Sequence, residues 1–127
     1  MPDNIIPADI NETPHKHELP EAYVQRMAEE KAASVQALHP QAIILAADTI
    51  VACGRRILGK PDNAADAERM LRLLSGRRHR VYTALSVKTS NQSRRKLVMT
   101  QVQFKRLSDQ EISAYLASGE WEGKAGA

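Results

Sequence analysis

Two charged residues interrupt patterns of the sequence that are otherwise apolar. Asp48 lies within residues 43–53, the most apolar run of the sequence. A carboxylate in such a run loses hydration unless it is paired, bound to a metal or placed at a strand end beside a cleft. Lys31 interrupts an otherwise apolar helical stripe that runs from Tyr23 to Leu38. The commoner explanations are a carboxylate just beyond the buried strand and a lysine whose ammonium group extends into water.

Three further charges could take part in binding an anion or a cation. Lys60 lies between Gly59 and Pro61, in a rigid loop with an accessible backbone. Such a lysine can bind phosphate as a point charge, although it is also common in plain turns. Glu12 and the nearby Asp9 precede the first expected helix, where they could bind a divalent cation or simply be solvated. Together, the carboxylates of Glu12 and Asp48 and the lysines Lys31 and Lys60 suit a site for a metal and a triphosphate.

The composition excludes several classes of protein. Apolar residues make up 43% and charged residues 26% of the 127 residues, as in an ordinary globular domain. No apolar run approaches the roughly 20 residues of a membrane-spanning helix, and the N-terminus has no signal-peptide pattern. A single cysteine, Cys53, excludes an internal disulfide. We therefore expect a cytoplasmic protein that does not bind a membrane.

Nucleic-acid binding is an alternative that the sequence supports only weakly. The basic runs at residues 77–80 and 94–96 could bind phosphate, but such runs are usually solvated strand edges and turns. Aromatic residues make up only 4%, which counts against surfaces that stack bases. The loop histidines His15, His17 and His39 could bind a metal, yet solvated histidines are much commoner. We therefore expect no nucleic-acid partner.

Hydrophobic periodicity predicts an α/β fold with a mixed sheet flanked by helices, in a single domain over residues 1–127. Helices are expected over residues 20–38 and 63–74, and between the cap Ser108 and Gly119. Strands are expected at residues 5–10, 43–53, 57–58, 81–88 and 96–105, and the last two form a hairpin. Continuous apolarity predicts that residues 43–53 are buried on both faces.

Six segments, in this order, carry a family resemblance: ADINETP (8–14), RMAEEKA (26–32), AADTIV (46–51), LGKP (58–61), SGRRHRVYT (75–83) and GEWEGKAGA (119–127). With them the chain resembles the Maf family, the septum-formation-inhibitor-like nucleoside triphosphate pyrophosphatases. The resemblance implies a Maf/ITPase-like architecture and allows a homodimer. It also implies a house-cleaning role in nucleotide metabolism.

The resemblance assigns roles to five residues. It implies that a nucleoside triphosphate is hydrolysed to the monophosphate and pyrophosphate with Mg²⁺ or Mn²⁺. Asp48 is then the general base, Glu12 a catalytic acid, and both are metal ligands. Lys31 and Lys60 contact the triphosphate. Thr49, like the ending at residues 124–127, is similar to the subgroup that acts on dTTP and UTP.

The chain also departs from the family pattern. Family members are longer: they open with a Ser-x-Ser-Pro-Arg-Arg phosphate loop and continue past Ala127 with a Tyr-x-Ile-Gln-Gly segment. Asn11 stands where an aspartate is usual. We therefore expect a domain that is truncated, with its sheet incomplete at both ends. A weak or inactive nucleotide-binding remnant of the same family is the alternative to an active enzyme.

Overall fold

The first helix, α1, spans Pro20–Leu38, as predicted. The computed structural model describes residues 10–127, so residues 5–9 of the strand expected at 5–10, and Asp9 with them, lie outside it. Proline is well suited to the first helical position, because its φ is already helical and its missing N–H is not needed there. The expected apolar face is buried from Tyr23 to Ala32. It ends earlier than expected, because Leu38 in the last turn is 74% exposed.

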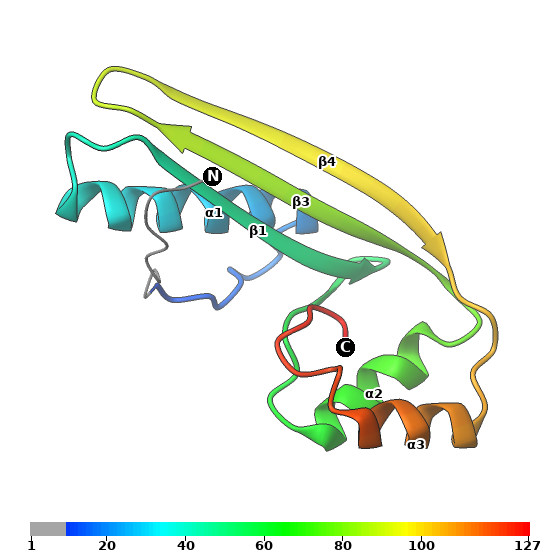
Figure 1. Ribbon diagram of the computed structural model, residues 1–127. Coiled ribbons are helices and arrows are strands. Elements are labelled where there is room, and N and C mark those ends of the chain that lie inside the picture. The colour runs from blue at the N-terminus through cyan, green and yellow to red at the C-terminus, as the bar shows by residue number, and fades with distance from the viewer. Residues whose placement is uncertain (1–9) are drawn as a thin grey trace. The chain divides into compact units, whose positions relative to one another are not determined.

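Four strands form one sheet in the order β2-β1-β3-β4 (Figure 1). Their bounds are Ile44–Cys53 for β1, Arg56–Leu58 for β2, Arg78–Lys88 for β3 and Ser93–Gln103 for β4. Strand β1 pairs antiparallel with β2, with Val51 opposite Leu58. The hairpin of β3 and β4 confirms the prediction, although both strands begin three residues earlier than expected.

The α/β class is confirmed, but a mixed sheet was expected and neighbouring strands in the described part of the chain run antiparallel (Figure 1). The reason lies in the connections. Strand β2 reverses the direction of β1, and the crossover through α2 then places β3 on the other side of β1. The crossover therefore joins β2 and β3, which are not neighbours in the sheet. Short turns join β1 to β2 and β3 to β4, and such turns connect only antiparallel strands. The third pair, β1 and β3, has β2 and α2 between its strands along the chain.

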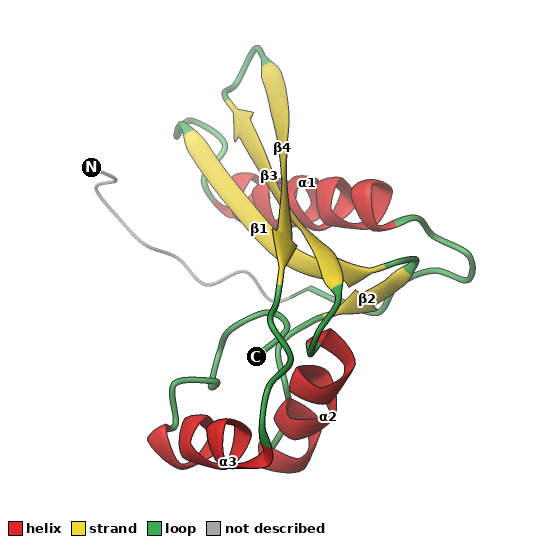
Figure 2. Ribbon diagram, turned by 90° about the vertical axis from the view of Figure 1, so that its right-hand side faces the viewer, coloured by secondary structure: helices red, strands yellow, loops and turns green. Residues whose placement is uncertain are grey.

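Helices α2 (Ala64–Leu74) and α3 (Asp109–Ser118) are in contact and lie side by side in both views (Figures 1 and 2). The predicted caps of both helices are present. Asn63 Oδ1 accepts a hydrogen bond from the Asp66 amide at 2.8 Å. Ser108 and Glu111 form a complete capping box, in which each side chain accepts from the other residue's amide. Each helix therefore begins where the sequence provides a side chain for its unpaired N–H groups.

The prediction that β1 is buried on both faces is wrong for its first half. Residues 44–49 alternate between more buried and more exposed positions, and Leu45 is 65% exposed. Only residues 50–52 are buried in succession. Helix α1 lies along one side of the first half of β1, so the described residues cover one face there (Figure 2). Because both faces of β1 carry apolar residues, the sequence predicted burial of both faces, whereas residues 44–49 are buried more on one face than on the other.

The chain divides into two compact units, and it passes from one to the other within β1, β3 and β4. Unit 1 consists of Met1–Asp48 and Thr83–Val98, and it contains α1. Unit 2 consists of Thr49–Tyr82 and Met99–Ala127, and it contains β2, α2 and α3. The core of unit 2 is formed by Val51, Leu58, Met70 and Leu74. No helix among residues 10–127 is long and apolar enough to cross a membrane.

Candidate active site

Three of the predicted site residues meet in unit 1, where Lys31 bridges two carboxylates. Its Nζ donates a hydrogen bond to Asp48 Oδ1 at 2.8 Å and lies 3.4 Å from Glu12 Oε1. The side chains of Lys31 and Asp48 are 19% and 13% exposed, whereas that of Glu12 is 55% exposed. We call Glu12, Lys31 and Asp48 the charge cluster. It has a half-buried end at Asp48 and an open end at Glu12.

Local structure explains how Lys31 and Asp48 come together. Lys31 follows Met27 and Ala28 on the apolar side of α1, so its aliphatic stem lies along the covered surface. Asp48 shares the more buried side of β1 with Ile44, because side chains two apart on a strand point to the same face. The ammonium group therefore reaches a carboxylate and does not simply extend into water. The pairing also offsets the cost of removing Asp48 from water.

The carboxylates of the charge cluster alter the acid–base behaviour of Lys31 and of the neighbouring Tyr23. Burial favours the neutral form of Lys31, but the hydrogen bond to Asp48 and the charges of Asp48 and Glu12 outweigh it. The net result is a raised pKa for Lys31. Burial, and after it the charges of the same two carboxylates, also raises the pKa of Tyr23. Lys31 therefore remains a cation, and Tyr23 a hydrogen-bond donor, at neutral pH.

Glu12 lies in a loop that side chains of α1 hold in place. The Tyr23 hydroxyl donates a hydrogen bond to the backbone oxygen of Glu12. Arg26 donates to both carboxylate oxygens of Glu18 at 2.8 Å and to the Thr13 backbone oxygen at 3.2 Å. The sequence did not predict these contacts. Their partners lie in a segment without helix or strand, where no periodicity indicates which residues meet.

The charge cluster has donors that suit a hard divalent cation. No group of three or more Asp, Glu, His or Cys side chains within residues 10–127 could hold a metal by itself. Mg²⁺, however, is commonly bound by one or two carboxylates together with phosphate oxygens of a substrate. Glu12 and Asp48 provide two such carboxylates, both within reach of Lys31. The residues present therefore fit a metal that binds together with a phosphate ligand.

Lys60 and Thr49 belong to unit 2 and are described within it. Lys60 is exposed, in the loop between β2 and α2, and has no ion-pair partner among the described residues. The chain end supports this loop, because the Gly126 amide donates to the Gly59 carbonyl at 2.9 Å. Thr49 is an exposed residue of β1. Lys60 is thus presented to solvent by a loop whose backbone is anchored.

The other candidates from the sequence are separate from the charge cluster. His15, His17 and His39 are exposed, as expected. His79 is not: it is buried, and its ring lies edge-to-face on Phe104 with centroids 4.8 Å apart. Burial lowers the pKa of His79. The expectation of a solvated basic run at residues 77–80 is therefore wrong for this one side chain.

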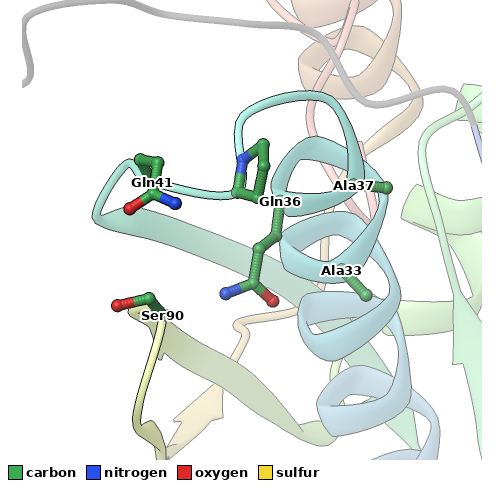
Figure 3. Close-up of a pocket in the computed structure, with 6 residues that line it drawn as sticks. Ala33, Gln36, Ala37, Gln41 and Ser90 are labelled. Atoms are coloured by element: carbon green, nitrogen blue, oxygen red, sulfur yellow. The ribbon is translucent and has the colours of Figure 1, made fainter.

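A surface hollow of about 570 Å³ lies elsewhere in unit 1 (Figure 3). It is lined by Ala33, Gln36, Ala37, Pro40, Gln41 and Ser90. The side-chain amide of Gln36 donates a hydrogen bond to the Thr89 carbonyl at 2.9 Å, which links α1 to the turn between β3 and β4. None of the predicted site residues lines this hollow. Its position does not coincide with the charge cluster.

The sequence profile of a family described as Maf-like protein matches residues 1–127. The chain belongs to the Maf-like family. Membership confirms the resemblance that the six ordered segments indicated. It also places the charge cluster, whose three residues lie in three of those segments, within a Maf-like chain.

Curated relatives of this Maf-like chain carry the name dTTP/UTP pyrophosphatase. The protein of Wolbachia pipientis wMel is 55% identical over 127 residues, covering 98% of this chain and 64% of the relative. That of Cereibacter sphaeroides is 56% identical over 125 residues, covering 98% and 65%. That of Roseobacter denitrificans is 55% identical over 126 residues, covering 99% and 66%. The chain thus spans slightly less than two thirds of the length of these relatives.

Proposed function

We propose that this protein is a nucleoside triphosphate pyrophosphatase that acts on dTTP and UTP. The observation that carries the proposal is the bridge of Lys31 Nζ between Asp48 and Glu12. It gathers two carboxylates and a cation in one half-buried place, which suits a triphosphate with its metal. Relatives at about 55% identity, named dTTP/UTP pyrophosphatase, support the choice of substrate.

Asp48 acts in this proposal as the general base. It takes a proton from a water molecule whose oxygen forms a bond to the α-phosphorus of the nucleotide. The bond from that phosphorus to the oxygen bridging to the β-phosphate breaks, and pyrophosphate leaves with the electron pair. The products are the nucleoside monophosphate and pyrophosphate. The half-buried position of Asp48 fits this role, because a general base must be fixed close to the attacking water.

Glu12 and Asp48 would hold the divalent cation, Mg²⁺ or Mn²⁺. When bound, the cation neutralises charge on the phosphate oxygens. Glu12 suits the outer position, because its side chain is the most exposed of the charge cluster. We also assign to Glu12 the role of a catalytic acid.

The remaining assignments concern substrate binding. Lys31 holds both carboxylates while the site is free, and it contacts phosphate when the substrate binds. Lys60 contacts the triphosphate as a point charge from its anchored loop. We assign Thr49 to substrate binding and to the preference for dTTP and UTP. We also propose that residues 1–127 form a single domain, that the protein is a homodimer, and that it is located in the cytoplasm.

The test is a substrate panel with direct detection of both products. The purified protein is incubated with dTTP, UTP, CTP, GTP and 7-methyl-GTP in the presence of Mg²⁺ or Mn²⁺. We expect pyrophosphate and the matching monophosphate in equal amounts, with dTTP and UTP turned over fastest. Release of inorganic phosphate with a nucleoside diphosphate would refute attack at the α-phosphorus. A folded protein that releases no pyrophosphate from any nucleotide would refute the enzyme.

A further inference from the structure

We infer that Tyr23 and Arg26 are positioning residues, which hold the loop of residues 11–19 on α1 so that Glu12 faces Lys31. The inference rests on the proposed function, because it concerns the same site. Neither side chain is a member of the charge cluster. Both project from α1 one turn apart, and together they contact the loop at three points.

Arg26 forms the more extensive of the two anchors. Its Nε and Nη2 donate to the two carboxylate oxygens of Glu18, both at 2.8 Å, in a forked geometry. Its Nη1 donates to Glu30 on the same helix at 2.8 Å. Its Nη2 also donates to the Thr13 carbonyl at 3.2 Å. A forked pair fixes direction as well as distance, so Arg26 sets the course of the loop beyond Glu12.

Electrostatics keep this anchor in place over a wide range of pH. The hydrogen bond from Arg26 lowers the pKa of Glu18 to about 2, although burial acts in the opposite direction. The Glu18 side chain is only 10% exposed and that of Arg26 21%. The pair is therefore shielded from solvent more than an ordinary surface ion pair, and it remains charged at any pH at which the protein would work.

Tyr23 fixes the loop at Glu12 itself. Its ring is buried, and its hydroxyl donates to the Glu12 carbonyl. The Arg26 guanidinium lies 5.6 Å from the centroid of the same ring, close enough for a cation–π contact. Tyr23 therefore packs under the loop while it holds the backbone of the residue whose carboxylate enters the charge cluster.

Glu12 needs these anchors because its own side chain is weakly held. Its carboxylate is 3.4 Å from Lys31 Nζ and 55% exposed, whereas Asp48 is 2.8 Å from the same atom. A solvated ion pair of that length contributes little to position. Residues 11–17 are exposed and form neither helix nor strand. The backbone contacts from α1 must therefore determine where the Glu12 carboxylate lies.

The first test measures the loop without any ligand. Hydrogen–deuterium exchange of residues 11–18 is compared in the parent, Arg26→Gln, Tyr23→Phe and Arg95→Gln. Arg95 is the matched control, because it pairs with Glu29 of α1 at 2.7 Å but does not touch the loop. We expect exchange at least about tenfold faster in the first two variants and unchanged in the control. Exchange at the parent rate in Arg26→Gln overturns the inference.

The second test asks whether Arg26 acts through Glu12. We expect Arg26→Gln to lower kcat for pyrophosphate release by about 10- to 100-fold in the parent, as for a displaced catalytic group. In a Glu12→Gln background the same substitution should change kcat no further. Losses that multiply would show that Arg26 acts independently of Glu12, and would overturn the inference. A parent without activity contradicts the proposed function alone, because the exchange measurement still decides on the anchors.

Discussion

At the scale of single residues, Lys31 supplies the positive charge of the charge cluster. It is the cation that both Asp48 and Glu12 contact, and Asp48 is only 13% exposed. Removing one partner of a buried pair leaves the other charge without compensation. We therefore expect Lys31→Met to destabilise the protein by about 1–2 kcal/mol, below the effect in a fully buried pair because part of Asp48 still reaches water. Denaturant unfolding measures this. A Lys31→Met/Asp48→Asn double variant should recover part of the loss, and no recovery would contradict the account.

A second prediction at this scale concerns how the contribution of Glu18 to stability depends on pH. Its pKa is lowered from 4.5 to about 2, first of all by the hydrogen bond from Arg26. A lowered pKa means that the contribution of Glu18 to stability is fully present above pH 4.5 and is lost as the pH falls toward 2. Unfolding should be followed over this range in the parent and in Glu18→Gln. We expect the stability difference between them to shrink with falling pH, and a constant difference would show that the pair is not responsible.

The sequence predicted part of the site at this scale, for a physical reason. Asp48 and Lys31 were conspicuous because each is a charge within an apolar pattern, and that pattern is local. Their contact was not predictable from spacing, because they lie 17 positions apart on a strand and a helix. Tyr23 was assigned only to the apolar face of α1. Its hydroxyl contact to Glu12 depends on a loop conformation that no periodicity encodes.

At the scale of elements, helices with local caps were predicted best, since Ser108 and Glu111 satisfy the start of α3 without help from elsewhere. The predicted start of β3 was three residues late, because basic residues there pair within the sheet although they read as a turn. Burial of β1 was overestimated, since an apolar run does not reveal what covers each face. Among residues 10–127 the sheet is antiparallel and not mixed as expected, because strand pairing depends on the path of the chain and not on local patterns.

The prediction at this scale concerns Gly126, whose amide anchors the loop that carries Lys60. A methyl group added at Gly126 would come within 2.7 Å of Val51, whereas one at Gly123 would meet nothing within 4 Å. Both glycines have nearly the same φ, +75° and +73°. We expect Gly126→Ala to cost about 1–3 kcal/mol more than Gly123→Ala, because the strain of positive φ is common to both and overpacking is not. Equal melting temperatures for the two variants would show that the chain end is not closely packed on Val51.

At the scale of the whole molecule, the less exposed carboxylate of the charge cluster, Asp48, is paired with a cation before any ligand binds. Lys31 already pairs with Glu12 and Asp48, so folding does not require a metal to neutralise them. We expect a chelator to abolish pyrophosphate release while leaving the melting temperature unchanged, and added Mg²⁺ to restore activity. A fall in melting temperature on chelation would mean that a metal contributes to the fold. Activity that persists in excess chelator would contradict the role proposed for Glu12.

The central claim is that Asp48 is the general base for pyrophosphate release, and one comparison tests it directly. The rate of pyrophosphate release from dTTP with Mg²⁺ is measured in the parent, in Asp48→Asn and in Asp62→Asn, whose aspartate is exposed and outside the charge cluster. We predict that Asp48→Asn loses about 10²- to 10⁴-fold in kcat, while Asp62→Asn keeps the parent rate. A folded Asp48→Asn variant that turns over dTTP as fast as the parent would contradict the claim.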